Sequence, residues 1–145
     1  MSKLNILFAT MWGNAEDVAK HTEELAKNKG IETNLQEMNQ VSIEDLKQME
    51  TVAFVTSTTG HGDFPTNGEA FWDLLSKEES NLNNLKYSVC ALGDSSHEVF
   101  CGAGKKLDEK LSSLNATKIL DRQECDGDDT GSEEWAQKFL EKISN

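Results

Sequence analysis

The sequence predicts a doubly wound α/β fold: a five-stranded parallel sheet in the order 2-1-3-4-5, with helices on both faces. Two observations predict it. Continuous apolar runs of strand length alternate along the 145 residues with apolar stripes of helical period. Polar, glycine-containing segments follow three of the apolar runs, where the ligand loops of such sheets lie. Function is therefore expected at the carboxyl ends of the strands.

The first half of the chain begins with a strand and a helix, followed by a second such pair. Leu4–Ala9 is a continuous apolar run, as in a buried parallel strand. The next apolar stripe, within residues 15–26, predicts a helix that Gly30 ends. Weak alternation over Ile31–Met38 suits a strand at the sheet edge, and Ser42 is placed to cap a short helix after it.

The second half repeats the alternation. Buried strands are predicted at Thr51–Thr56 and Leu85–Leu92, and a final short strand at Thr117–Leu120. The helical stripes are Ala70, Phe71, Leu74 and Leu75; Ala103, Leu107, Leu111 and Leu114; and Trp135, Phe139, Leu140 and Ile143. We find no internal repeat and no low-complexity linker, so residues 1–145 are expected to form one domain.

Composition narrows the function classes. The net charge of −12 repels phosphate backbones and anionic lipids, so neither nucleic acid nor a membrane is an expected partner. The same charge either speeds encounters with a basic protein surface or simply keeps the protein in solution. Cys90, Cys101 and Cys125 are too widely spaced for a disulfide framework or metal pair, which favours reduced thiols in the cytoplasm. No metal is expected either at the acidic run that begins at Asp126, because Gln137 stands where a calcium loop needs glutamate.

The segment after the first strand has the features of a phosphate-binding turn. It reads Thr10, Met11, Trp12, Gly13, Asn14 and Ala15, and the predicted helix starts inside it. A helix N-terminus binds phosphate through free N–H groups. The motifs of nucleoside triphosphate and dinucleotide loops are absent, so a compact monophosphate fits best. An ordinary capped turn would have a similar sequence, so this segment alone does not distinguish a phosphate-binding turn from a structural one.

Two further loops have the composition of a ligand pocket. Ser57–Asn67 follows the third strand and is long, polar and punctuated by Gly60 and Gly62, which permit backbone conformations closed to other residues. Leu92–Cys101 follows the fourth strand. Two polar loops beside a phosphate turn predict a site for a flat, hydrogen-bonding ring system with a phosphate tail.

These segments resemble the flavodoxins, and most of all the FMN domains of diflavin reductases of the sulfite reductase flavoprotein type and their short-chain relatives. The resemblance spans the chain and is carried by Ser57–Asp63, Leu92–Phe100 and Leu120–Asp126. It implies the flavodoxin-like fold and one FMN. It places the phosphate at residues 10–15 and the two sides of the ring at Thr58, Thr59, Gly60, His61 and Gly62 and at Leu92, Gly93, Asp94, His97, Phe100 and Cys101, with Asp126 near the flavin.

The resemblance also implies a function. Such a protein is a monomeric one-electron carrier of low potential rather than an enzyme, and it needs no catalytic acid, base or nucleophile. The Gly60 carbonyl would accept a hydrogen bond from N5–H of the reduced flavin. The implied donor is an NADPH-dependent flavin reductase, and the implied acceptor is a haem or radical enzyme.

Three positions depart from the family pattern. Trp12 stands where a hydroxyl usually binds phosphate, His97 where a tyrosine usually stacks on the flavin, and Thr59 where an aromatic is frequent. Losing two stacking contacts of about 0.5–1.5 kcal/mol each weakens FMN binding by roughly one to two powers of ten. The alternative function is therefore a non-redox interaction module on the same fold, with weakened FMN binding.

Two other classes share the architecture. A phosphorelay receiver needs acidic residues where Thr10 and Met11 stand and an aspartate where Ser57 and Thr58 stand, so this class is excluded. A flavin enzyme of the quinone-reductase kind stays possible, although such enzymes usually have longer chains and pockets built between subunits.

Overall fold

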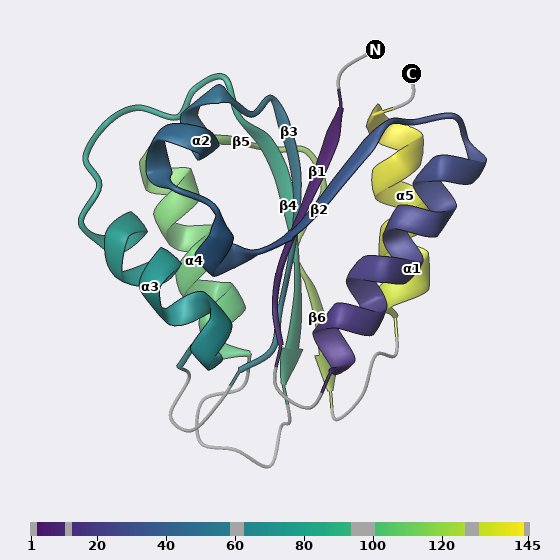
Figure 1. The fold of residues 1–145 in the computed structure, drawn as a ribbon, viewed down its shortest axis with the longest axis horizontal. Helices are drawn as coiled ribbons and strands as arrows, with labels where there is room; N and C mark the ends of the chain where they lie inside the picture. The colour runs from purple at the N-terminus through teal and green to yellow at the C-terminus, as the bar shows by residue number, and fades with distance from the viewer. Residues whose placement is uncertain (1–2, 11–12, 59–62, 94–100, 127–130, 144–145) are drawn as a thin grey trace.

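The predicted sheet order is confirmed. The computed structural model describes residues 3–10, 13–58, 63–93, 101–126 and 131–143. The sheet follows the order β2-β1-β3-β4-β5, with β6 also paired to β4 (Figure 1). Its strands are β1 Leu4–Ala9, β2 Thr33–Glu37, β3 Thr51–Thr56, β4 Lys86–Gly93, β5 Thr117–Lys118 and β6 Gln123–Asp126. Every pairing is parallel, so the carboxyl ends of the strands share one edge.

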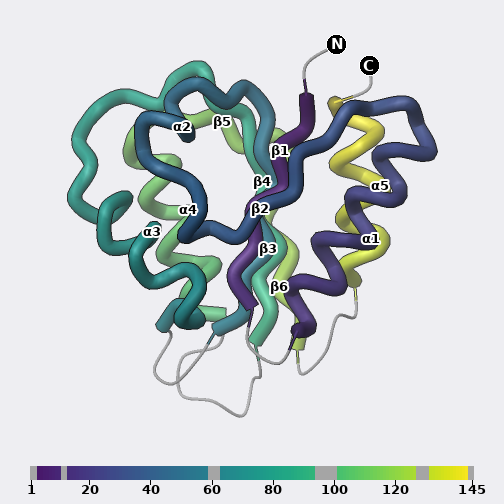
Figure 2. The backbone as a smooth tube through the Cα atoms, in the orientation of Figure 1, coloured from purple at the N-terminus to yellow at the C-terminus, as the bar shows by residue number. Residues whose placement is uncertain are grey.

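Helices cover both faces of the sheet. They are α1 Asn14–Asn28, α2 Ile43–Gln48, α3 Thr66–Ser76, α4 Gly102–Ser113 and α5 Ser132–Ile143, with the 3₁₀ turn η1 at Met38–Gln40. Helices α2, α3 and α4 lie on one face, and α1 and α5 lie on the other (Figures 1 and 2). This double cover explains why β1 is buried along its whole length, whereas β2 at the edge is only partly buried.

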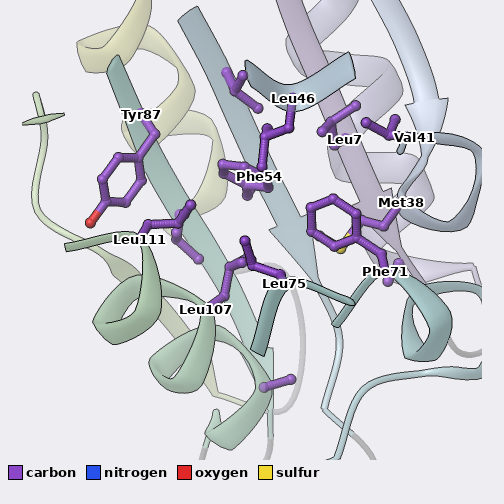
Figure 3. Packing of buried hydrophobic residues seen from close by; sticks show 14 of the residues in the cluster. Leu7, Met38, Val41, Leu46, Phe54, Phe71, Leu75, Tyr87, Leu107 and Leu111 are labelled. Carbon is purple, nitrogen blue, oxygen red and sulfur yellow. The ribbon is translucent and has the colours of Figure 1, made fainter. Parts of the chain in front are cut away.

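Two apolar cores result, one on each face. Figure 3 shows the first, where Phe54 of β3 and Tyr87 of β4 pack against Phe71 of α3 and Leu107 of α4. In the second, Trp135 of α5 stacks on Phe139 with ring centroids 5.8 Å apart. The Trp135 indole Nε1 donates to Ser88 Oγ at 2.8 Å, which gives this buried polar group a partner.

The last strand differs from the prediction. We expected one strand over Thr117–Leu120, but β5 stops at Lys118 and a second segment, β6, pairs with the other end of β4. The Leu120 carbonyl accepts a hydrogen bond from Ser88 Oγ at 2.9 Å, and Arg122 turns to Asp108 of α4. Between the two segments, these side-chain contacts and a backbone bond from the Ile119 N–H to the Tyr87 carbonyl at 3.0 Å hold the chain to β4 and α4.

The buried face of α3 differs in part from the predicted apolar stripe, so this prediction was partly wrong. Of its stripe, Phe71 and Leu75 are buried, but Leu74 is 53% exposed and Ala70 is exposed. The buried face instead includes Gly68. Trp72 packs on Phe64 with ring centroids 5.1 Å apart.

None of the helices in the described ranges is long and apolar enough to cross a membrane.

Candidate functional site

The carboxyl ends of β1 and β3 form the centre of the candidate site. Ala9 pairs with Thr56, the last residue of each strand, and Ser57 N–H donates to the Ala9 carbonyl at 2.9 Å. The chain then runs from β1 to α1 on one face and from β3 towards α3 on the other (Figure 1). Such a divergence is the topological switch point where parallel sheets hold their ligands.

The turn from β1 into α1 has the geometry of an anion site. Gly13 has a φ of 85°, a left-handed conformation that favours glycine, and directly precedes the first helical residue, Asn14. The first N–H groups of a helix have no partners within the helix and give its start a partial positive charge. Here Ala15 N–H donates to Thr10 Oγ1 at 3.2 Å. The Thr10 hydroxyl and these N–H groups therefore meet in one place.

Thr10 has a second partner that the sequence did not reveal. Its backbone N–H donates to Oδ1 of Asn67, in the first turn of α3, at 3.0 Å. Asn67 was visible only as one of the polar residues in the loop after β3, and no local signal pairs it with a residue 57 positions earlier.

At the same edge of the sheet, Thr58 after β3 and Gly93 at the end of β4 lie beside the start of α4. Thr58 Oγ1 accepts the N–H of Ala103, in the first turn of α4, at 3.3 Å. A Cβ added to Gly93 would lie 2.8 Å from the backbone nitrogen of Cys101, so no side chain fits there. The backbone at the end of β4 is thereby packed against the start of α4.

Cys101 contributes its backbone rather than its thiol to this edge. The side chain is fully buried, and Sγ contacts the Ala91 carbonyl at 3.5 Å and the Cys125 carbonyl at 3.9 Å. Burial raises the pKa of the Cys101 thiol to about 12. A neutral, inward-facing thiol packs as a small apolar side chain.

Two other predicted site residues are described. Leu92 is buried in the core beneath α1 and α5. Asp126 ends β6 opposite Gly93, and it is exposed at the same edge as the ends of β1 and β3. The part of the site at Asp126 is thus acidic and open to water.

The remaining predicted site residues lie outside the described ranges. They are Met11, Trp12, Thr59, Gly60, His61, Gly62, Asp94, His97 and Phe100. The structure brings together Thr10, Gly13, Asn14 and Ala15 at the start of α1, with Thr58, Gly93 and Asp126 along the same strand ends. Among the described residues, no group of three or more His, Cys, Asp or Glu side chains is arranged to hold a metal ion.

The sequence model of the Flavodoxin family matches residues 6–139 of this chain. The sulfite reductase [NADPH] flavoprotein alpha-component of Vibrio parahaemolyticus is 41% identical over 143 residues, which covers 97% of this chain and 23% of that protein. The corresponding protein of a Shewanella strain is 41% identical over 142 residues, covering 97% and 24%. The chain thus spans about a quarter of the length of these relatives.

Solved structures agree with the fold. A flavodoxin from Streptococcus pneumoniae superposes with a TM-score of 0.86 at 26% identity, covering 99% of this chain and 98% of that one. A cysteine variant of the Pseudomonas aeruginosa flavodoxin superposes with a TM-score of 0.85 at 28% identity, covering 99% of both.

Proposed function

The chain belongs to the flavodoxin family, and on that premise we propose that it is a one-electron carrier with one FMN at the carboxyl edge of its sheet. FMN is the cofactor that the family implies. The observation that carries the proposal is the start of α1: Thr10 Oγ1 and the first helical N–H groups meet directly behind β1, at the switch point.

The residues of this turn fit a phosphate monoester. Residues 10–16 contain no lysine or arginine, so the phosphate charge would be balanced by N–H groups and the partial positive charge of the helix start. Gly13 supplies the left-handed backbone that turns the chain into α1. Thr10, Gly13, Asn14 and Ala15 would then hold the phosphate.

The ring would lie along the ends of β3 and β4. When bound, FMN supplies the redox chemistry, and the protein positions it and sets its potential. Thr58 and the backbone at Gly93 would border the ring, and Asp126 would stand at its rim. The net charge of −12 opposes the gain of a further negative charge, which favours a low potential.

The proposal extends to partners and organisation. The donor would be an NADPH-linked flavin reductase, which is supported by the flavoprotein relatives of an NADPH enzyme. The acceptor would be a haem or radical enzyme with a basic docking surface, because the carrier is strongly acidic. We propose a cytoplasmic, monomeric carrier in which residues 1–145 form one FMN-binding domain, with no reaction of its own.

Electron delivery to a generic acceptor tests this function without the native partners. The protein is loaded with FMN, reduced chemically without oxygen and mixed with oxidised cytochrome c. We expect bound FMN in a one-to-one ratio and rapid reduction of two cytochromes for each FMN. Protein that quenches no FMN fluorescence at micromolar concentration, or that holds FMN but leaves cytochrome c oxidised, would refute the carrier function. The first of these outcomes would favour a non-redox interaction module.

A further inference from the structure

Asn67 makes two hydrogen bonds that join three separate segments of the chain. Its Oδ1 accepts the backbone N–H of Thr10 at 3.0 Å, and its Nδ2 donates to Glu37 Oε2 at 2.9 Å. Thr10 follows β1, Glu37 ends β2 and Asn67 lies in the first turn of α3. The Asn67 carboxamide thus ties the start of the candidate phosphate site to the end of β2 and to α3.

The chemistry of the partners fixes how this carboxamide is oriented. The Thr10 N–H only donates and the Glu37 carboxylate only accepts, so Oδ1 must face Thr10 and Nδ2 must face Glu37. Glu37 is itself held, because its carboxylate accepts the backbone N–H of Gln40 and its own N–H donates to Gln40 Oε1 at 2.9 Å. Asn67 therefore presents a fixed acceptor to Thr10.

Anchoring α3 does not require Asn67. Asn39 of η1 already binds that helix twice, donating from Nδ2 to the Thr66 carbonyl at 2.9 Å and accepting the Phe71 N–H at 3.1 Å. In addition, a Cβ on Gly68 would lie 2.6 Å from Ala9 Cβ, so the helix start already sits directly against the end of β1. The contact that distinguishes Asn67 is the one to Thr10.

We propose that Asn67 is a positioning residue for a phosphate monoester. It fixes the Thr10 backbone, and Thr10 Oγ1 in turn accepts the N–H of Ala15 at 3.2 Å, so the hydroxyl and the start of α1 are set before a ligand arrives. The proposal rests on the proposed FMN function and deepens it. It assigns Asn67 to recognition of the phosphate and not of the ring.

A comparison of FMN with riboflavin, which lacks the phosphate, tests this assignment. Affinities of the apoprotein are measured by quenching of flavin fluorescence. Asn67→Ala is expected to weaken FMN binding about tenfold, because the hydrogen bond that fixes the Thr10 backbone is lost, and riboflavin binding by less than about twofold. Asn39→Ala is the matched control: it loosens α3 without touching Thr10, and is expected to leave the ratio of the two affinities unchanged.

A charge-preserving swap tests the orientation of the carboxamide. Asn67→Asp keeps the acceptor for Thr10 but puts two carboxylates against each other, and should weaken FMN binding at least as much as Asn67→Ala. Adding Glu37→Gln restores a donor to the new carboxylate at the same net charge, and should recover most of the loss. A double variant no better than Asn67→Asp would contradict the proposed chain of hydrogen bonds.

Hydrogen exchange provides a readout that needs no flavin. In the apoprotein, the Thr10 amide should exchange at least about tenfold faster in Asn67→Ala than in the wild type, because its acceptor is lost. An Asn67→Ala variant that loses affinity for both flavins equally would overturn this assignment alone. Wild-type protein that binds both flavins equally would overturn this assignment and also the proposed phosphate site at the start of α1. Wild-type protein that binds neither flavin would overturn the proposed function, and this assignment with it.

Discussion

The hydroxyl of Tyr87, in β4, donates a 2.6 Å hydrogen bond to Oδ1 of Asp108, in α4. The other carboxylate oxygen, Oδ2, accepts from Arg122 Nη1, also at 2.6 Å. The Asp108 side chain is only 4% exposed, so this carboxylate is compensated by its partners rather than by water. The cluster joins the sheet, α4 and the chain between β5 and β6.

Tyr87 should resist ionisation. It is the only tyrosine in the chain, so the tyrosinate absorbance of the protein reports on it alone. Burial, and then its hydrogen bond to Asp108, raise the pKa of Tyr87 well above the usual value. Because the pKa is raised in the folded state, the associated stability is present below about pH 10 and is lost as the pH rises above it. We expect no tyrosinate at pH 10 in the folded protein and ordinary titration in urea; reversible ionisation near pH 10 with the fold intact would contradict this.

Arg122 should matter more to stability than Lys118. Arg122→Ala removes the 2.6 Å partner of a buried carboxylate and should lower the free energy of unfolding by about 2 kcal/mol. Lys118 contacts the same oxygen at 3.4 Å and its side chain is 36% exposed, so Lys118→Ala should cost less than about 1 kcal/mol. Urea unfolding measures both, and equal losses would argue against the cluster as described.

Gly104 of α4 should tolerate no side chain. A Cβ there would lie 2.3 Å from Ala91 Cβ in β4. Replacing glycine by alanine in a helix normally gains up to about 1 kcal/mol, but overpacking of this kind costs about 1–3 kcal/mol, so Gly104→Ala should destabilise the protein. The added substitution Ala91→Gly removes the opposing methyl group and should restore part of the loss. A stabilised Gly104→Ala variant in urea unfolding would show that the helix stands farther from the sheet.

The cysteines should be inert in the folded protein. Cys90, Cys101 and Cys125 are all fully buried, so none of them is accessible to a reagent in water. Burial also raises the pKa of Cys101 to about 12, so this cysteine holds little thiolate at pH 8. We expect a thiol-specific disulfide reagent to label none of them quickly in native protein and all three after unfolding in urea. Fast labelling of one thiol in the native state would place that cysteine at the surface.

Local signals were sufficient for most of the fold. The apolar run Thr51–Thr56 coincides with β3, Ser42 accepts the Asp45 N–H at 3.0 Å as a helix cap, and Gly30 has the expected left-handed backbone with φ 78°. Each of these depends on residues close together in the sequence. The position of the turn at Thr10 followed from the strand that precedes it.

Contacts between distant residues explain what the sequence did not predict. The break in the last strand depends on Arg122 reaching Asp108, 14 positions earlier, and the acceptor for Thr10 comes from Asn67, 57 positions later. Leu74 and Leu75 are equally apolar. Leu75 is buried and Leu74 is exposed because of how α3 packs against η1 and β1. Neither hydrophobic period nor motif carries this information.

The proposed carrier function predicts that bound FMN is reduced at equilibrium in two separate one-electron steps. The FMN-loaded protein is reduced stepwise with dithionite without oxygen, and its visible spectrum is recorded after each addition. We predict two separated one-electron steps, with a distinct long-wavelength band that rises to its maximum near one electron per FMN and then disappears. A single two-electron step with no such band, as for free FMN, would contradict the one-electron carrier.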